Sequence, residues 1–507
     1  MTSARLVIDP RFPVGNVDRR LFGSFVEHLG RCVYDGIYEP GHPASDENGF
    51  RQDVLELVRE LGVSMVRYPG GNFVSGYKWE EAIGPKADRP RRLDMAWHSV
   101  ETNEVGLDEF ARWAKLAEVE TMYAVNLGTR GIEDALAVLE YANVESGTTL
   151  SQQRIDNGTE KPHDIRMWCL GNEMDGPWQL GFSTAEEYGS KAAQVAKAML
   201  QLDSTLQLVV CGSSSAHMPT FGAWEQTVLR KTYADVTHIS CHAYYEETDG
   251  DTGSFLASAV DMDFFIDSIV ATADAIGAEL HNAKRIEISF DEWNVWYQSR
   301  YQNEDRITAA QDWPYAPRLL EDIYSVLDAV VFGNLMISLL KHADRVTSAS
   351  LAQLVNVIAP IMTEPGGAAW RQTTFFPFAT TARLAKGRSL QTIVTSDRYN
   401  TQRFGDVDFL DSAATWDAAT GEGAIFLVNR HQTETMTLSV DMTGFGPVQI
   451  SEALTLSDDD IRAVNDLANQ TRVSLKPNES VSMAEGTLLI ELPPVSWSAI
   501  SFEGKNA

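Results

Sequence analysis

Two glutamates, Glu173 and Glu292, each stand where an apolar run of the sequence ends. Glu173 lies in MWCLGNEMDG, residues 167–176, and Glu292 lies in RIEISFDEWNVWY, residues 285–297. Burying a carboxylate is unfavourable unless it is paired or takes part in chemistry. Glycoside hydrolysis with retention uses two carboxyl groups, since one protonates the leaving oxygen while the other attacks the anomeric carbon. Two glutamates on separate strands would suit that reaction.

Eight strand-like runs between residues 20 and 356 are the elements that would position these glutamates. Helical patterns fall between them, and in residues 51–62 and 183–200 the apolar side chains recur on one helix face. Such alternation indicates parallel strands joined by helical crossovers, and eight of them favour a (β/α)8 TIM barrel within the α/β class. An open doubly wound sheet is the alternative, although no G-x-G-x-x-G motif is present. The runs are LFGSFVEH, VSMVRYPGG, TMYAVNLG, DIRMWCLGNE, LQLVVCGS, VTHISCHAYY, RIEISFDEWN and RVTSASLAQLVN.

The sequence changes character after about residue 375. Short alternating segments separated by Gly, Asp and Asn predict an antiparallel β-sandwich that continues to the C-terminus. The N-terminal run ARLVIDP is an additional strand that could join either unit. We predict a catalytic barrel over residues 15–375 and a jelly-roll-like sandwich built from residues 1–14 and 376–507. Because no low-complexity linker separates the two units, we expect them to pack tightly.

The formal net charge is −30, from 71 acidic and 41 basic residues. An acidic surface repels nucleic acid and anionic membranes, so neither is an expected partner, and a neutral substrate is favoured. The N-terminus lacks the apolar core of a signal peptide, which predicts a cytoplasmic protein. The longest apolar run, AVVFGNLMISLL, is shorter than the ~20 residues of a membrane span. Cys169, Cys211 and Cys241 lie in apolar runs and are expected to be buried free thiols.

Several of the eight strand ends carry polar or aromatic residues that could bind a sugar. In a TIM barrel, function lies at the C-terminal ends of the strands, so these side chains would converge on one barrel mouth. Amides, hydroxyls and flat rings there suit the hydroxyl groups and apolar faces of a sugar. The residues at strand ends are Glu27, Arg67, Asn72, Asn172, Glu173, His242, Tyr244, Glu292, Trp296 and Gln353.

Other chemistries have weaker support in the sequence. His238 and His242 would lie about 13 Å apart in a strand, and neither H-E-x-x-H nor G-x-S-x-G occurs, so we predict no metal site, no cofactor and no acyl transfer. Asp175 is expected to cap a loop or support its neighbours. Asp291 precedes Glu292 and is expected to point to the opposite side of its strand, in a structural role.

The chain closely resembles the α-L-arabinofuranosidases of glycoside hydrolase family 51. The resemblance spans nearly the whole chain and is carried by FGSFVEHLGRCVYDGIYEP, RYPGGNFVSGYKWEEAIGP, WCLGNEMDGPWQ, HAYY and FDEWNVWY. It implies a (β/α)8 barrel fused to a β-sandwich, with Glu173 as general acid/base and Glu292 as nucleophile. It also implies an intracellular homo-oligomer, usually a hexamer. The residues that it places around the sugar are Glu27, Arg67, Asn72, Asn172, Tyr244 and Gln353, with Trp97 and Trp296 as walls of the pocket.

The expected function is therefore that of a retaining, exo-acting α-L-arabinofuranosidase acting on short arabino- and arabinoxylo-oligosaccharides. An endo-glucanase or β-xylosidase on the same scaffold is the alternative among enzymes, since related barrels host several specificities. A sugar-binding protein without catalysis is the alternative outside them. The presence of both Glu173 and Glu292 argues against that last interpretation, because a binding protein needs neither.

Overall fold

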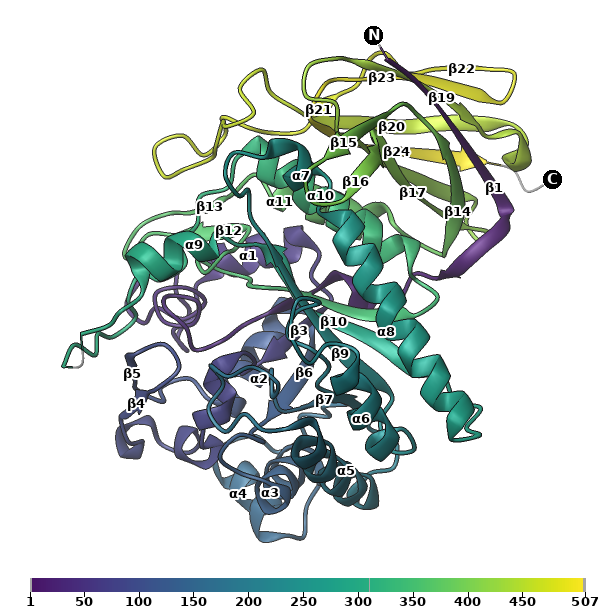
Figure 1. Ribbon diagram of the computed structural model, residues 1–507. Coiled ribbons are helices and arrows are strands. Elements are labelled where there is room, and N and C mark those ends of the chain that lie inside the picture. Colours follow the sequence, from purple (N-terminus) through teal and green to yellow (C-terminus); the bar gives the residue numbers. More distant parts are fainter. Residues whose placement is uncertain (1, 310, 505–507) are drawn as a thin grey trace.

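The computed structural model describes residues 2–309 and 311–504 and contains a closed barrel of eight parallel strands (Figure 1). Neighbouring strands pair in the order β10-β11-β2-β3-β6-β7-β8-β9. Each expected run supplies one of these strands, so the predicted TIM barrel is confirmed. The strands are β2 (Gly23–Phe25), β3 (Met65–Tyr68), β6 (Glu120–Val125), β7 (Met167–Leu170), β8 (Gln207–Val210), β9 (His238–Tyr245), β10 (Glu287–Val295) and β11 (Val346–Leu351).

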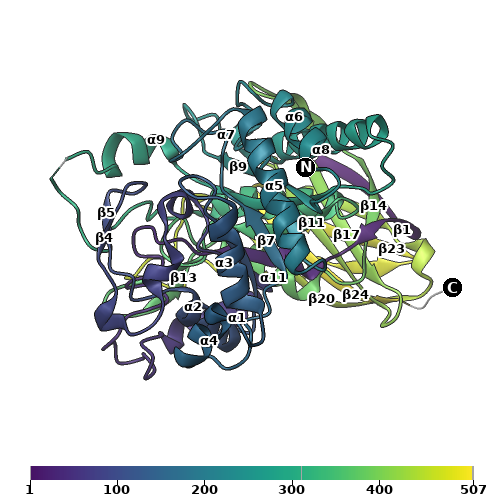
Figure 2. The same cartoon turned by 90° about the horizontal axis from the view of Figure 1, so that it is seen from below.

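Helices lie outside the barrel strands, and α2 to α6 cover the side away from the C-terminal unit (Figures 1 and 2). The two helices predicted from periodicity are confirmed as α1 and α5. Thr184 caps α5, because its side chain accepts a hydrogen bond from the backbone N–H of Glu187. The helices are α1 (Gln52–Leu61), α2 (Leu107–Ala117), α3 (Ile132–Asn143), α4 (Thr149–Asp156), α5 (Ala185–Leu202), α6 (Ala223–Thr232), α7 (Thr252–Leu256), α8 (Ala259–Glu279), α9 (Gln298–Arg300), α10 (Val326–Lys341) and α11 (Phe375–Leu384).

The C-terminal unit is a β-sandwich whose strands are linked in one ten-stranded sheet, in the order β21-β20-β24-β18-β17-β14-β1-β19-β23-β22. The N-terminal strand, β1, joins this unit and pairs antiparallel with β14 but parallel with β19. A wholly antiparallel sandwich was expected, and this one parallel pair departs from it. A strand that arrives from the far end of the chain is not bound by hairpin connectivity. The strands are β1 (Thr2–Asn16), β14 (Arg388–Thr395), β17 (Leu410–Asp417), β18 (Glu422–Asn429), β19 (Met436–Asp441), β20 (Val448–Leu456), β21 (Lys476–Pro477), β22 (Ser482–Ala484), β23 (Thr487–Leu492) and β24 (Ser496–Gly504).

Three two-stranded hairpins lie outside the barrel and the main sheet of the described residues. The first, between β3 and α2, projects at the barrel mouth and carries Trp97 in its turn. The hairpins are β4 (Arg92–Asp94) with β5 (Ser99–Glu101), β12 (Ile361–Thr363) with β13 (Ala369–Arg371), and β15 (Arg398–Thr401) with β16 (Gly405–Asp408).

Helix α10 is the apolar run AVVFGNLMISLL and joins the two units. It packs against β10 of the barrel on one side and against β17, β18 and β24 of the sandwich on the other. A Cβ added to Gly333 would lie 2.3 Å from the Trp497 ring, so only glycine permits this close approach. The tight packing expected of the two units is confirmed. Within the described residues, no helix is long and apolar enough to cross a membrane.

Candidate active site

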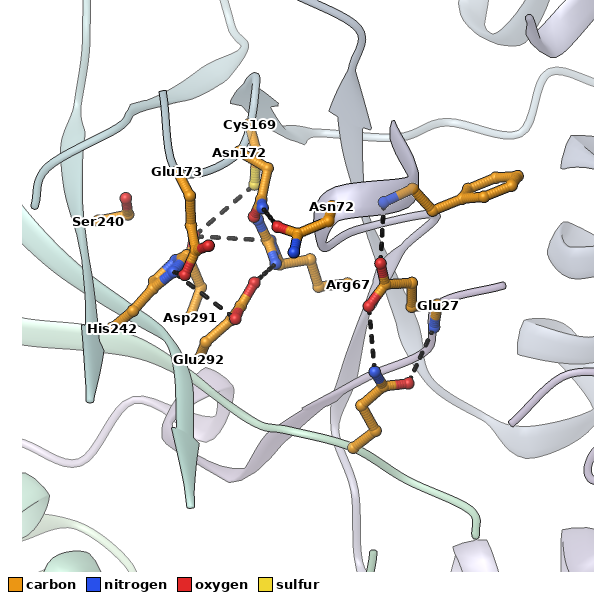
Figure 3. Close-up of polar contacts among 12 residues, drawn as sticks. Glu27, Arg67, Asn72, Cys169, Asn172, Glu173, Ser240, His242, Asp291 and Glu292 are labelled. Carbon is orange, nitrogen blue, oxygen red and sulfur yellow. Dashed lines mark hydrogen bonds and ion pairs between the residues drawn. The ribbon is translucent and has the colours of Figure 1, made fainter. Parts of the chain in front are cut away.

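The predicted site residues gather at the C-terminal end of the barrel, and most of them form one hydrogen-bonded network (Figure 3). Arg67 lies on β3, His242 and Tyr244 on β9, and Glu292 on β10. The other members follow the ends of β2, β3, β7, β10 and β11 or come from the β4–β5 hairpin: Glu27, Asn72, Trp97, Asn172, Glu173, Trp296 and Gln353. The strands therefore bring these side chains together at the C-terminal mouth of the barrel, as barrel geometry requires.

Glu292 is buried and accepts hydrogen bonds from polar side chains on two other strands of the barrel. Arg67 Nη1 donates to its Oε1 at 2.9 Å, and the Tyr244 hydroxyl donates to its Oε2 at 2.8 Å. The other end of the guanidinium, Nη2, donates to Asn172 Oδ1 at 2.6 Å, and Asn172 Nδ2 reaches Asn72 Oδ1 at 3.3 Å. A carboxylate held in this way has few remaining conformations, which suits a group that must meet one atom of a substrate.

Glu173 follows β7 in the left-handed backbone region, with a φ of 42°. This conformation is uncommon for a residue with a side chain and is typical of functional sites. His242 Nδ1 lies 2.9 Å from Glu173 Oε1, and Trp178 Nε1 donates to Oε2 at 2.6 Å. Trp178 was missed by the sequence analysis. Its contact depends on how the 171–184 loop folds back, and no periodic pattern in that loop predicts this.

Asp291 corrects an expectation: it points into the barrel, on the same side as Glu292. Its carboxylate accepts from His242 Nε2 at 2.9 Å and lies 3.8 Å from Arg67 Nε and 3.7 Å from Cys169 Sγ. The pairing of β10 shifts register against both neighbouring strands in the segment 289–293. Such a bulge breaks the alternation of side chains, and bulges are common beside active sites. Asp291 therefore anchors the two cations that face Glu292.

Charged neighbours shift the pKa values of His242, Glu292 and Asp291. Burial alone would lower the pKa of His242, but the carboxylates of Glu292, Asp291 and Glu173 raise this pKa to about 10. His242 is therefore a cation at neutral pH and donates from both ring nitrogens. Burial raises the pKa of Glu292, against the opposing effects of His242 and Arg67. Burial also opposes ionisation of Asp291, but Arg67 and His242 outweigh it and lower its pKa.

Glu27 forms a second polar centre with neutral partners. Its Oε1 accepts from the backbone N–H of Phe73 at 2.9 Å and from Trp97 Nε1 at 2.7 Å, while Oε2 accepts from Gln353 Nε2 at 3.2 Å. Burial raises the pKa of Glu27 well above its usual value. Gly71 of the YPGGN motif permits this arrangement, because it has a φ of 57° and an added Cβ would lie 2.1 Å from Glu27 Oε2.

A series of aromatic rings in contact runs from Trp97, which donates to Glu27, to Tyr244, which donates to Glu292. Trp296 packs edge-on against Tyr244, with ring centroids 5.0 Å apart. Tyr301 lies 6.0 Å from Trp97 and 6.0 Å from Trp296, so it links the two tryptophans predicted as walls. Tyr301 was also missed from the sequence, because the segment after β10 that carries it has no strand or amphipathic signal.

Three ligand atoms, one each from Glu173, His242 and Glu292, lie within 4.8 Å of one another, which is a spacing that could hold a metal ion. The sequence spacing gave no sign of this group. Its donor chemistry fits a metal poorly, because a protonated imidazole has no free lone pair and Arg67 already places a positive charge on Glu292. The cluster supplies its own cations where a metal would sit.

Comparison with known proteins relates both units to one family. The family model of the α-L-arabinofuranosidase 1 domain matches residues 57–260, and that of the α-L-arabinofuranosidase C-terminal domain matches residues 291–496. An intracellular exo-α-(1→5)-L-arabinofuranosidase from Streptomyces lividans is 57% identical over 502 residues, covering 99% of this chain and 75% of that relative. An exo-α-(1→6)-L-arabinofuranosidase from Bifidobacterium longum is 55% identical, covering 99% and 97%. The solved structure of a family 51 α-L-arabinofuranosidase from Bifidobacterium longum has a TM-score of 0.95 at 50% identity, covering 99% and 100%.

Proposed function

Since the chain belongs to the family 51 α-L-arabinofuranosidases, we propose that it removes terminal α-L-arabinofuranosyl units with retention of configuration. The observation that carries this proposal is the pair Glu173 and Glu292: one carboxylate oxygen of each lies within 4.8 Å of one on the other, and His242 Nδ1 lies 2.9 Å from Glu173 Oε1 and 3.6 Å from Glu292 Oε2. Retaining glycosidases hold their two carboxyl groups about 5–5.5 Å apart, whereas inverting enzymes leave about 6.5–9.5 Å for a water molecule. The short separation favours a covalent glycosyl-enzyme intermediate.

In the first step, Glu173 donates a proton to the glycosidic oxygen while a Glu292 oxygen attacks the anomeric carbon. Three buried carboxyl groups, those of Glu173, Asp291 and Glu292, face two cations, His242 and Arg67. The mechanism requires Glu292 as the attacking carboxylate, to which Arg67 and Tyr244 donate hydrogen bonds, and Glu173 as the proton donor. In the second step, Glu173 removes a proton from water, and this water releases the sugar from Glu292.

The substrate that we propose is a short arabino- or arabinoxylo-oligosaccharide with arabinofuranose at its non-reducing end. The polar groups around the pocket come from several different strand ends, and the rings of Trp97, Tyr301 and Trp296 adjoin one another across its wall. Polar groups contributed by several strand ends suit the hydroxyl groups of one small sugar rather than a continuous chain. The names of the two relatives above give different linkages, (1→5) and (1→6). The linkage that this chain prefers is therefore to be measured with both types of oligosaccharide.

We also propose a cytoplasmic location and a homo-oligomer, expected to be a hexamer. The name of the Streptomyces relative describes it as intracellular, which supports the first part. Fractionation of the source cells tests the location. Light scattering of the purified chain tests the assembly, and a monomer at micromolar concentration would contradict it.

Proton NMR of the first product formed from an aryl α-L-arabinofuranoside tests the mechanism. The α-anomer of free arabinose should appear first and then mutarotate. Initial release of the β-anomer would show inversion and would exclude Glu292 as a nucleophile. In the same assay series, the aryl α-L-arabinofuranoside should be preferred over aryl β-D-xylopyranoside and β-D-glucopyranoside by several powers of ten, because misplaced hydroxyls leave buried polar groups unpaired.

A substitution at Glu173 tests the assignment of the acid. Glu173→Ala should slow hydrolysis of an oligosaccharide far more than that of a nitrophenyl arabinofuranoside, because nitrophenolate leaves without much help from a proton. Azide should restore turnover of the nitrophenyl substrate through attack on the glycosyl-enzyme. Equal losses of the glycosylation rate on both substrates would contradict the assignment. Preferential internal cleavage of a long β-glucan by the unaltered enzyme would instead favour an endo-glucanase.

A further inference from the structure

Trp296 and Tyr297 are adjacent residues just after β10, and their side chains have different partners. Trp296 packs against Tyr244, the hydrogen-bond partner of Glu292. The Tyr297 hydroxyl donates to Asp328 Oδ1 at 2.7 Å, and the Tyr297 backbone N–H donates to Asp322 Oδ2 at 3.0 Å. Tyr297 is thus held at both ends by carboxylates, one from Asp328 in the first turn of α10 and one from Asp322 in the segment before the helix.

Asp328 is itself part of the cap of α10. Its other oxygen, Oδ2, accepts from the backbone N–H and the hydroxyl of Ser325, both at 2.7 Å. Ser325 in turn caps the helix by accepting from the Asp328 N–H. Asp328 is 1% exposed, so its partners are set by the protein and not by solvent. Loss of the Tyr297 hydroxyl would leave a buried carboxylate oxygen without its donor.

A long connection of the sandwich supports the same helix end. This connection, residues 457–475 between β20 and β21, is here called the sandwich arm, and it projects beyond the sheet in Figure 1. Helix N-termini leave backbone N–H groups without partners inside the helix. The arm supplies two partners, because Val326 N–H donates to the Ala463 carbonyl at 3.0 Å and Leu327 N–H donates to the Ile461 carbonyl at 2.9 Å.

The arm also reaches the end of β9. Arg462 pairs with Glu247 at 2.6 Å, and Glu247 lies two residues beyond Tyr245, which ends β9. The Tyr245 carbonyl accepts from the Trp296 N–H at 2.9 Å. The arm therefore contacts the segment that follows β9, on which Tyr244 stands, and the start of α10, whose Asp328 holds Tyr297. By contrast, Arg472 pairs with Asp458 inside the arm itself.

Among the described residues, the buried Nε1 of Trp296 has no hydrogen-bond partner, so no hydrogen bond holds the indole. The position of the ring therefore depends on its contacts and on the backbone that carries it. That backbone is fixed on one side by Tyr245 and on the other by Tyr297.

We propose that Tyr297 is a positioning residue that holds Trp296 in the wall of the sugar pocket, and that the sandwich arm completes its support. This inference rests on the sugar-binding role proposed for Trp296. In this inference the sandwich affects the shape of the pocket. It does so through α10, without touching the substrate.

The main test compares Tyr297→Phe with Tyr141→Phe. Tyr141 offers a matched control, because its hydroxyl also donates to a buried aspartate, Asp108, at 2.6 Å but lies on α3 outside the site. Tyr297→Phe should raise KM for an aryl arabinofuranoside roughly three- to tenfold while kcat changes less than about twofold, since binding is weakened alike before and during reaction. Tyr141→Phe should leave both constants unchanged, whatever its effect on Tm.

Trp296→Ala serves as the benchmark and should raise KM more than Tyr297→Phe. An unchanged KM in Trp296→Ala would refute the sugar-binding role of Trp296, and the inference would fall with it. A raised KM in Trp296→Ala together with an unchanged KM in Tyr297→Phe would overturn the inference alone. Equal changes in Tyr297→Phe and Tyr141→Phe would also overturn it, because they would indicate a general loss of stability.

The role of the arm is tested by Arg462→Ala, with Arg472→Ala as the control. Arg462→Ala should raise KM in the same direction as Tyr297→Phe but by less, because the Arg462 side chain is half exposed and its ion pair is weak. Arg462→Lys should restore most of the loss. If Arg472→Ala has the same effect, or if Arg462→Ala has none, the arm does not support the pocket.

Discussion

Two buried glutamates at strand ends, Glu27 and Glu292, have opposite surroundings. Glu27 accepts hydrogen bonds from an indole, a backbone N–H and an amide, all of them neutral. Glu292 accepts from the Arg67 guanidinium and the Tyr244 hydroxyl and lies 3.6 Å from the cationic His242. Burial raises the pKa of both groups, but only Glu292 has cations that oppose the rise.

This difference shows that position alone does not assign a role to a carboxyl group. Two environments at one barrel mouth can keep one carboxyl group as a binding group and prepare another for attack. A nucleophile must be ionised and free of competing protons, which the cations around Glu292 favour. A group that binds a sugar hydroxyl, which is the role proposed for Glu27, needs only a fixed orientation, and the neutral donors around Glu27 provide it.

The largest effect is expected from Glu292→Gln. This change keeps the shape of the side chain but removes the oxyanion that we propose attacks the substrate, and it turns one acceptor facing Arg67 or Tyr244 into a donor. We expect kcat/KM to fall by roughly 10⁴-fold or more on every arabinofuranoside, as when a nucleophile is removed from other hydrolases. Circular dichroism and Tm establish that the variant is folded. Residual activity above about 1% would show that Glu292 is not the nucleophile.

The matched change Glu27→Gln should have a much smaller effect. The amide oxygen of the new glutamine can still accept from Phe73 and Trp97. Its NH₂ group, however, would face the NH₂ group of Gln353, so that one hydrogen bond is lost. One mismatched buried hydrogen bond costs about 1–3 kcal/mol, so we expect a loss of roughly ten- to a hundredfold in kcat/KM. A loss as large as that of Glu292→Gln would remove the contrast between the two sites and would place Glu27 in the chemistry.

The pH dependence of stability tests whether His242, beside Glu292, is held as a cation. The pKa of His242 in the folded protein, about 10, lies above its ordinary value of 6.5. Its protonated form therefore stabilises the fold fully below about pH 6.5, and this contribution is lost as the pH rises through about 10. We expect the Tm of the unaltered protein to exceed that of His242→Gln by a few degrees at pH 7 and by less at pH 10.5. A gap that is the same at both values would show that His242 is not held as a cation.

Much of this arrangement could be predicted from the sequence, and each exception has a physical cause. Alternating strand and helix patterns locate all eight barrel strands, and barrel geometry brings their ends together. The inward orientation of the Asp291 side chain was not predicted, because a β-bulge changes which side of the strand a side chain occupies and leaves no mark in the composition. Trp178 and Tyr301 escaped because loop contacts depend on the rest of the fold. The assignment of roles to Glu173 and Glu292 came from family resemblance, since both lie at strand ends like Glu27.

The smallest effect is expected from the removal of metal ions. This experiment also distinguishes the surroundings of Glu292 from those of Glu27. Only the catalytic side offers a group with suitable geometry among the described residues, that of Glu173, His242 and Glu292. A metal there would have to displace the proton from His242, whose pKa is raised to about 10, and would lie beside the Arg67 guanidinium. The repulsion between like charges and the cost of deprotonation both oppose binding. Prolonged dialysis against a chelator should therefore leave kcat and KM unchanged. A clear loss of activity that zinc or calcium restores would show that the catalytic centre needs a metal in addition to its own two cations.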